Sequence, residues 1–129
     1  MVHTINQTTK VNPSVTSMGA TLYVAWTGED NRLNVIQSPD NGVTWRDQKI
    51  LSETSEYGPA ILNANGVLYL AWTGQDDRLN ALTSKDGINW SDKFTSEETS
   101  PSAPGLTVKG QTVFITWRGM DNRLNVMTL

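Results

Sequence analysis

The residues best suited to chemistry in this sequence form one set that occurs three times. Each copy holds an Asp, an Arg two positions later and an Asn two positions after that, all downstream of a Trp. A carboxylate and a guanidinium can bond neighbouring hydroxyl groups, and an indole ring can stack on the apolar face of a sugar. The set therefore predicts three related carbohydrate-binding sites on one face. Its members are Trp26, Asp30, Arg32 and Asn34, then Trp72, Asp76, Arg78 and Asn80, then Trp117, Asp121, Arg123 and Asn125, with Tyr57 as an added aromatic residue in a linker.

A structural interpretation of the same set stays open. Each Trp ends an apolar run, which also suits a residue of the hydrophobic core. An Asp and an Arg two positions apart can hold a tight turn, and the following Asn can bond the same turn. Tyr57 can equally be ordinary solvated surface. Repetition supports both interpretations, because every repeat needs the residues that maintain its fold.

The composition of the 129-residue chain excludes several other classes of function. It has no Cys, which excludes disulfides, thiol catalysis and Cys-ligated metals, and its one His argues against a His-based triad. No metal or cofactor is expected. The net charge of −3 argues against a nucleic-acid partner. No apolar run is long enough for membrane insertion and no signal peptide is visible, so we expect a soluble chain of unknown compartment.

The elements that carry the set are predicted to be β-strands. The three Trp residues are 46 and 45 positions apart. Runs such as VLYLAW combine β-branched and aromatic residues without a helical period, and Gly-containing turns separate them. Four short antiparallel strands in about 46 residues match one blade of a β-propeller, with a β-sandwich as the alternative. The expected fold is all-β, with three four-stranded antiparallel blades at about 5–50, 51–95 and 96–129.

A second motif, Ser-x-Asp followed by Gly and Trp, lies downstream of the first two copies of the set. It resembles the Asp-box, or BNR repeat, of sialidases and other propellers. In that family the box is the hairpin between the third and fourth strands of a blade, where Ser and Asp hold backbone amides and Trp packs into the blade. The resemblance implies this structural role for Ser38, Asp40, Gly42 and Trp45, and for Ser84, Asp86, Gly87 and Trp90, where one residue is deleted.

The same resemblance raises the question of sialidase activity. Such enzymes also need three arginines that converge from different blades, an acid, and a Tyr with a partnering Glu. The Arg-Ile-Pro string usual near their start is absent here. Because no catalytic constellation is visible, we expect no enzyme activity.

The phase of the repeats predicts an assembly. Residues 1–7 match the outer strand of a blade, whereas Leu129 matches Ser38 and Ser84, so the third blade lacks the counterpart of residues 39–46. Three blades cannot close a ring and would leave apolar faces exposed. We therefore expect a cyclic homo-oligomer in which the N-terminal strand of each chain completes the last blade of its neighbour. A dimer of six blades is favoured over a trimer of nine, and a fragment of a longer propeller is the alternative.

Two functions are compatible with these observations. The first is a lectin-like, non-catalytic propeller that binds glycans at repeated sites on the face of the Asp–Arg–Asn turns. The second is a structural, self-assembling propeller or a protein-interaction scaffold without a small ligand.

Overall fold

Eleven β-strands and no helix make up the chain, and the computed structural model describes all 129 residues. The strands lie where β-branched and aromatic residues concentrate, and turns with positive-φ Gly, Asn or Asp separate them. No helix that could cross a membrane is present. The strands are β1 Ser14–Met18, β2 Thr21–Thr27, β3 Arg32–Ser38, β4 Arg46–Thr54, β5 Ala60–Ala64, β6 Val67–Thr73, β7 Arg78–Ser84, β8 Ser91–Thr99, β9 Gly105–Lys109, β10 Thr112–Arg118 and β11 Leu124–Thr128.

The strands form three antiparallel sheets in which each strand pairs with the next one along the chain. The sheets are β1–β4, β5–β8 and β9–β11. The prediction of an all-β chain with three repeated sheets is confirmed, but the third sheet has three strands and the arrangement is not closed. The first two sheets also extend beyond the predicted boundaries near residues 50 and 95. They do so because Thr54 still pairs with Arg32, and Thr99 with Arg78.

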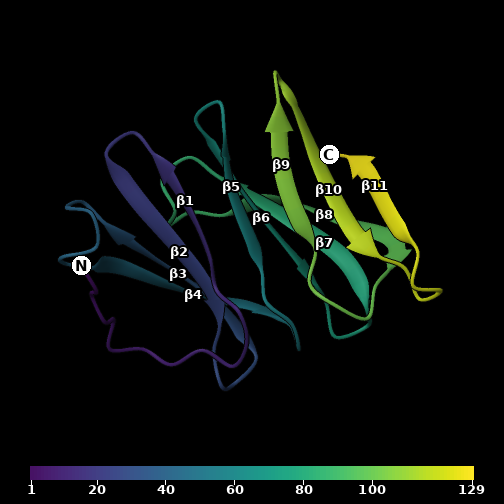
Figure 1. Ribbon diagram of the computed structural model, residues 1–129, viewed down its shortest axis with the longest axis horizontal. Coiled ribbons are helices and arrows are strands. Elements are labelled where there is room, and N and C mark those ends of the chain that lie inside the picture. The colour runs from purple at the N-terminus through teal and green to yellow at the C-terminus, as the bar shows by residue number, and fades with distance from the viewer.

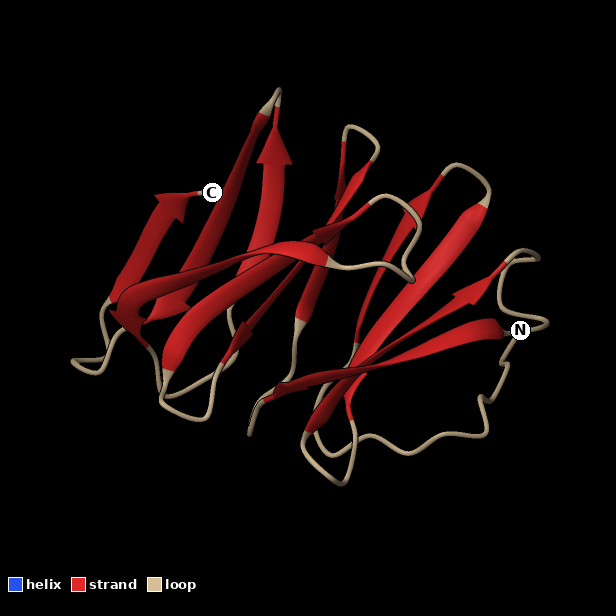
Figure 2. Ribbon diagram, turned by 180° about the vertical axis from the view of Figure 1, so that it is seen from behind, coloured by secondary structure: helices blue, strands red, loops and turns tan.

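The three sheets stand side by side in an open arc, with β1, β5 and β9 next to one another along its inner edge (Figures 1 and 2). The inner strands are also bonded directly, since the Ser14 and Thr16 hydroxyls accept the N–H groups of Ile61 and Asn63 at 3.1 and 3.0 Å. The N-terminal segment lies at one end of the arc and β11 at the other (Figure 1).

Apolar side chains between neighbouring sheets hold the arc together. Leu33 and Val35 on β3 face the second sheet and pack with Leu70 and Trp72 on β6. The second sheet packs in the same way on the third, through Leu79 and Ala81 against Ile115 and Trp117. Each pair of sheets therefore repeats one mode of face-to-face packing.

No further sheet packs on either end of the arc. We call the side of β9–β11 that is turned away from the second sheet the C-terminal end face; it exposes 85% of Leu124 and 68% of Val126. We call the side of β1–β4 that is turned away from the second sheet the N-terminal end face. It exposes 62% of Val15, whereas the corresponding Ile61 is 5% exposed between two sheets.

Residues 1–13 form no strand in the single chain. They run beside the first sheet, far from β11 (Figure 1). Completion of the third sheet by an N-terminal strand therefore does not take place within one chain, and its completion by a neighbouring chain stays a prediction.

Candidate functional site

The three Asp–Arg–Asn turns lie at the same end of their sheets as the linkers between sheets. The Ser55 N–H, in the first linker, donates to the carbonyl of Asn31 at 2.9 Å, and the Ser100 N–H donates to Asp77 at the same distance. The two Asp-box hairpins connect β3 to β4 and β7 to β8, at the opposite end of the sheets. The face that carries the turns and linkers is named the linker face.

Each Asp of the set holds its own turn. In all three repeats one carboxylate oxygen accepts the backbone N–H of the Arg two positions later, at 3.1, 3.1 and 3.0 Å. In all three the Asn amide donates to that Arg carbonyl at 2.9–3.0 Å. In the first two repeats the Asn side-chain oxygen also accepts a bond from the outer strand, from Gln48 and Thr95. Turn stabilisation thus occupies one carboxylate oxygen of each Asp and the side-chain amide of each Asn.

The first two arginines reach across the sheet to the outer strand. Arg32 Nε donates to the carbonyl of Leu51 at 2.9 Å, and Arg78 Nε donates to Ser96 at 3.0 Å. A register shift in the strand pairing at each Arg leaves that carbonyl outside the regular ladder. Arg123 has no outer strand to bond, and its side chain extends into solvent with a 3.8 Å ion pair to Asp121.

The three Trp rings belong to the core. Trp26, Trp72 and Trp117 are 4%, 1% and 6% exposed, and Lys93 Nζ lies 5.9 Å from the centre of the Trp72 ring. Rings buried to this extent cannot stack on a sugar as they stand. The structure therefore supports the core interpretation of the Trp residues.

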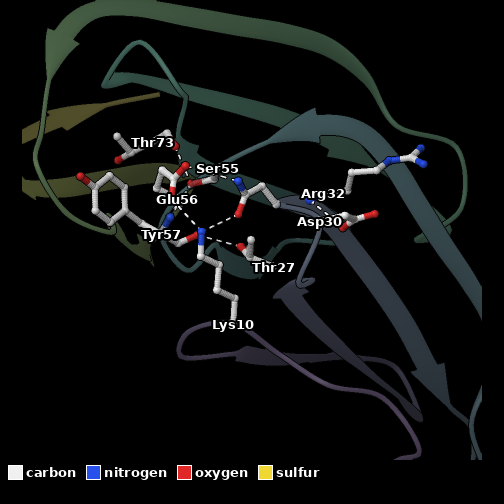
Figure 3. Close-up of polar contacts among 9 residues, drawn as sticks. Lys10, Thr27, Asp30, Arg32, Ser55, Glu56, Tyr57 and Thr73 are labelled. Atoms are coloured by element: carbon white, nitrogen blue, oxygen red, sulfur yellow. Dashed lines mark hydrogen bonds and ion pairs between the residues drawn. The ribbon is translucent and has the colours of Figure 1, made fainter.

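A chain of hydrogen bonds that the sequence analysis missed ties the linkers to the sheets (Figure 3). The Thr27 hydroxyl donates to the Tyr57 carbonyl at 2.7 Å, and the Ser55 hydroxyl donates to the Thr73 carbonyl at 2.6 Å. Thr27 and Thr73 occupy equivalent positions in their repeats, directly after Trp26 and Trp72. This recurrence is the feature of the sequence that could have indicated their role. Tyr57 takes part through its backbone, while its ring is half-buried.

One ion pair joins successive linkers on the same face. Lys10 Nζ lies 2.7 Å from a Glu56 carboxylate oxygen and donates to Asn31 Oδ1 at 2.6 Å (Figure 3). The Lys10 and Glu56 side chains are 32% and 49% exposed, so the contribution of this pair to stability is modest.

The two Asp-box turns are built alike. Asp86 Oδ1 accepts the N–H groups of Asn89 and Ile88 at 2.8 and 2.9 Å, and the Ser84 hydroxyl accepts the N–H of Gly87. These bonds to the charged form, that from the Asn89 backbone foremost, hold the pKa of Asp86 well below its ordinary value.

In the first box, Asp40 bonds both the hydroxyl and the N–H of Thr44, and these bonds lower its pKa. Ser38 accepts the N–H of Gly42, and Trp45 Nε1 donates to the Gly42 carbonyl as Trp90 does to Gly87. Both carboxylates are therefore occupied by their own turns.

The largest cavity, of about 430 Å³, lies at the inner edge of the arc. The linkers and the starts of β1, β5 and β9 line it, including Pro13, Pro59 and Pro104. No charged side chain lines it. No group of three or more His, Asp or Glu side chains that could hold a metal ion is present.

Comparisons with known proteins bear on the fold. No protein-family model and no curated protein sequence matches the chain. Nineteen solved chains match in structure, among them an exo-1,5-α-L-arabinanase from a bovine ruminal metagenomic library, with a TM-score of 0.54 and 17% sequence identity. The match covers 91% of this chain and 49% of the arabinanase, so this chain spans about half of that structure. The likeness shows an all-β chain whose three antiparallel sheets resemble consecutive propeller blades.

Proposed function

We propose that the chain is a non-catalytic propeller subunit that assembles head to tail with copies of itself into a closed ring. The exposure of the C-terminal end face carries this proposal. Leu33 and Val35 of the first sheet are 0% exposed because the second sheet covers them. Their counterparts in the third sheet, Leu124 and Val126, are 85% and 68% exposed. A further sheet packed in the mode already used twice within the chain would cover them.

The free energy of such packing favours assembly. Complete burial of a Leu or Val side chain stabilises by about 1.5–3 kcal/mol. The N-terminal end face is a suitable partner surface, because its Val15, Val24 and Trp26 correspond to residues of the second sheet that already pack on Leu33 and Val35. Closure into a ring of two chains, with six blades, satisfies both end faces; a ring of three chains, with nine, is the alternative.

The non-catalytic part of the proposal is supported by the positions of the repeated polar residues. The carboxylates of Asp30, Asp76 and Asp121 each accept a backbone N–H of their own turn, and Asp40 and Asp86 are bonded within their hairpins. Because these residues stabilise turns, the fold accounts for their recurrence in every repeat, and no catalytic role is needed to explain it.

The molar mass of the chain in solution tests the assembly. An integer multiple of 14.2 kDa, two or three, is expected over a dilution series. A folded monomer at every concentration would refute the proposal.

Carbohydrate binding on the linker face is the second candidate function. One oxygen of each Asp in the set and the terminal nitrogens of each Arg accept or donate no hydrogen bond within the chain. These groups suit sugar hydroxyls, and a ring would present several weak sites at once. The arabinanase that the chain resembles is named for a sugar polymer, so arabinan oligosaccharides are the class to test first.

A glycan array separates the two candidates. Carbohydrate binding predicts retention of a sugar that weakens in the double variant Asp76→Ala with Arg78→Ala while the oligomer persists. No binding at high protein concentration would remove this candidate and leave the assembly.

A further inference from the structure

We infer that residues 1–8 form the outer strand of the third sheet of a second copy of this chain. The inference rests on the proposed assembly and specifies its mechanism: the sheet β9–β11 is completed by strand donation, in a defined register. Three observations carry it: the position of the segment in the repeat, its contacts within its own chain, and an arginine at the edge of the third sheet that lacks the bond its two counterparts make.

Residues 1–8 occupy the position of an outer strand within the repeat. With the three linker prolines aligned, residues 1–8 correspond to 47–54, the greater part of β4, and to 92–99, the greater part of β8. Ile5 then corresponds to Leu51, which is buried between the first two sheets. The segment thus places an apolar residue where an outer strand needs one.

The segment already contacts its own first sheet as β4 contacts the second sheet. Gln48 Nε2 donates to Gln7 Oε1 at 3.4 Å, and the corresponding atoms in the next repeat, Lys93 Nζ and Glu53 Oε1, are 2.8 Å apart.

The start of the linker follows the same correspondence. The Thr9 hydroxyl lies 3.4 Å from the Thr27 carbonyl, and its counterpart, the Ser55 hydroxyl, donates to the Thr73 carbonyl at 2.6 Å. Two contacts of the segment thus recur at the equivalent positions of the next repeat, where an outer strand and its linker make them.

Apolar contacts agree with this position. Ile5 is half-buried and lines a small cavity together with Val24 and Trp26 of the N-terminal end face. Leu51, its counterpart, belongs to the same core cluster as Trp72, the counterpart of Trp26.

The edge of the third sheet at β11 lacks the carbonyl group that an outer strand supplies to the arginine in the other two sheets. Arg32 and Arg78 each donate Nε–H to a carbonyl of their outer strand, and the position of that carbonyl corresponds to Ile5 in both cases. Arg123 is exposed and makes no such bond. We expect Arg123 Nε to donate to the carbonyl of Ile5 of the second copy.

The pairing register follows from the two complete sheets. Val35 pairs with Lys49 and Ala81 pairs with Phe94. The corresponding pair across the contact between chains is Val126 with His3 of the second copy. Directly opposed residues in antiparallel strands have Cα atoms about 4.5–5.5 Å apart, within the range that a disulfide can bridge.

Cysteine cross-linking tests the register, since the chain has no Cys of its own. The double variant His3→Cys with Val126→Cys should form covalent multimers on mild oxidation. Within one chain the N-terminus and β11 lie at opposite ends of the arc, so the bond must join two chains (Figure 1). The matched control is His3→Cys with Lys109→Cys, whose second position is exposed on β9 and away from the expected strand; it should stay largely uncross-linked.

The outcomes separate this inference from the proposed assembly. Cross-linking of the first pair and not of the control supports strand donation. An uncross-linked first pair in a chain that is nevertheless multimeric would overturn strand donation and leave the assembly in place. A monomer at every concentration would overturn both.

A second variant tests the arginine without touching the core. Arg123→Gln should raise the dissociation constant of the assembly by roughly ten-fold or more, as expected for loss of a charged hydrogen bond. The control Arg46→Gln, an exposed arginine in the first sheet, should leave the dissociation constant unchanged. Equal dissociation constants for Arg123→Gln and the wild type would contradict the expected bond to Ile5.

Discussion

Replacement of Leu124 by Ala is the perturbation that separates folding from assembly most cleanly. Leu124 is 85% exposed in the single chain, whereas its counterparts Leu33 and Leu79 are 0% and 1% exposed between sheets. The substitution removes about three carbon groups of roughly 0.8 kcal/mol each, so about 2 kcal/mol at each contact between chains. A ring of two chains has two such contacts, which gives about 4 kcal/mol and a rise of about a thousand-fold in the dissociation constant.

The stability of the isolated chain should change by less than about 0.5 kcal/mol, because an exposed side chain contributes little. Leu33→Ala is the matched contrast: it removes the same atoms from a buried position and should reduce the free energy of unfolding by about 2–5 kcal/mol. Sedimentation velocity over a dilution series measures the first effect, and denaturant unfolding measures the second. A Leu124→Ala dissociation constant equal to that of the wild type would refute the coverage of this face by a second copy.

Three further predictions concern the turns. Arg78→Ala loses the bond from Nε to the outer strand and should reduce the free energy of unfolding by about 1 kcal/mol, measured in denaturant. Asp86 has a pKa below its ordinary value of 3.8 in the folded chain, so its stabilisation is present above about pH 4 and is lost as the pH falls further. Asp86→Asn should accordingly lose less stability than the wild type between about pH 5 and pH 2, and equal losses would contradict the assigned bonds. A Cβ on Gly87, at φ 76°, would lie 2.5 Å from the Tyr23 ring, so Gly87→Ala should destabilise by about 2 kcal/mol or more. Gly110→Ala, at φ 60° with nothing within 4 Å, should cost only about 1 kcal/mol, and a similar melting temperature for the two variants would refute the clash.

The repeat in the sequence was sufficient to predict the sheets. Strands with β-branched and aromatic residues recur in constant phase with Gly turns between them, and local preference and periodicity agree at these positions. The outer strands were less well predicted. Their apolar residues are few, and their last pairs, such as Arg32 with Thr54, lie beyond a register shift that the sequence does not reveal.

The roles of the repeated polar residues could not be decided from the sequence. A Trp at the end of a strand has the same local pattern whether the next sheet covers it or solvent reaches it, and burial depends on the neighbouring sheet. The bond from Arg32 Nε to Leu51 likewise depends on a carbonyl freed by irregular pairing 19 positions away. Only the tertiary arrangement shows that Trp26 is covered and that Arg123 lacks the partner that Arg32 and Arg78 have.

Contacts between copies at the end faces of the arc are tested most directly by the molar mass of the unmodified chain, measured by sedimentation equilibrium over a wide range of concentrations. We expect a species of twice 14.2 kDa, or three times that mass, that dissociates only on strong dilution. A single folded species of 14.2 kDa at every concentration would contradict it.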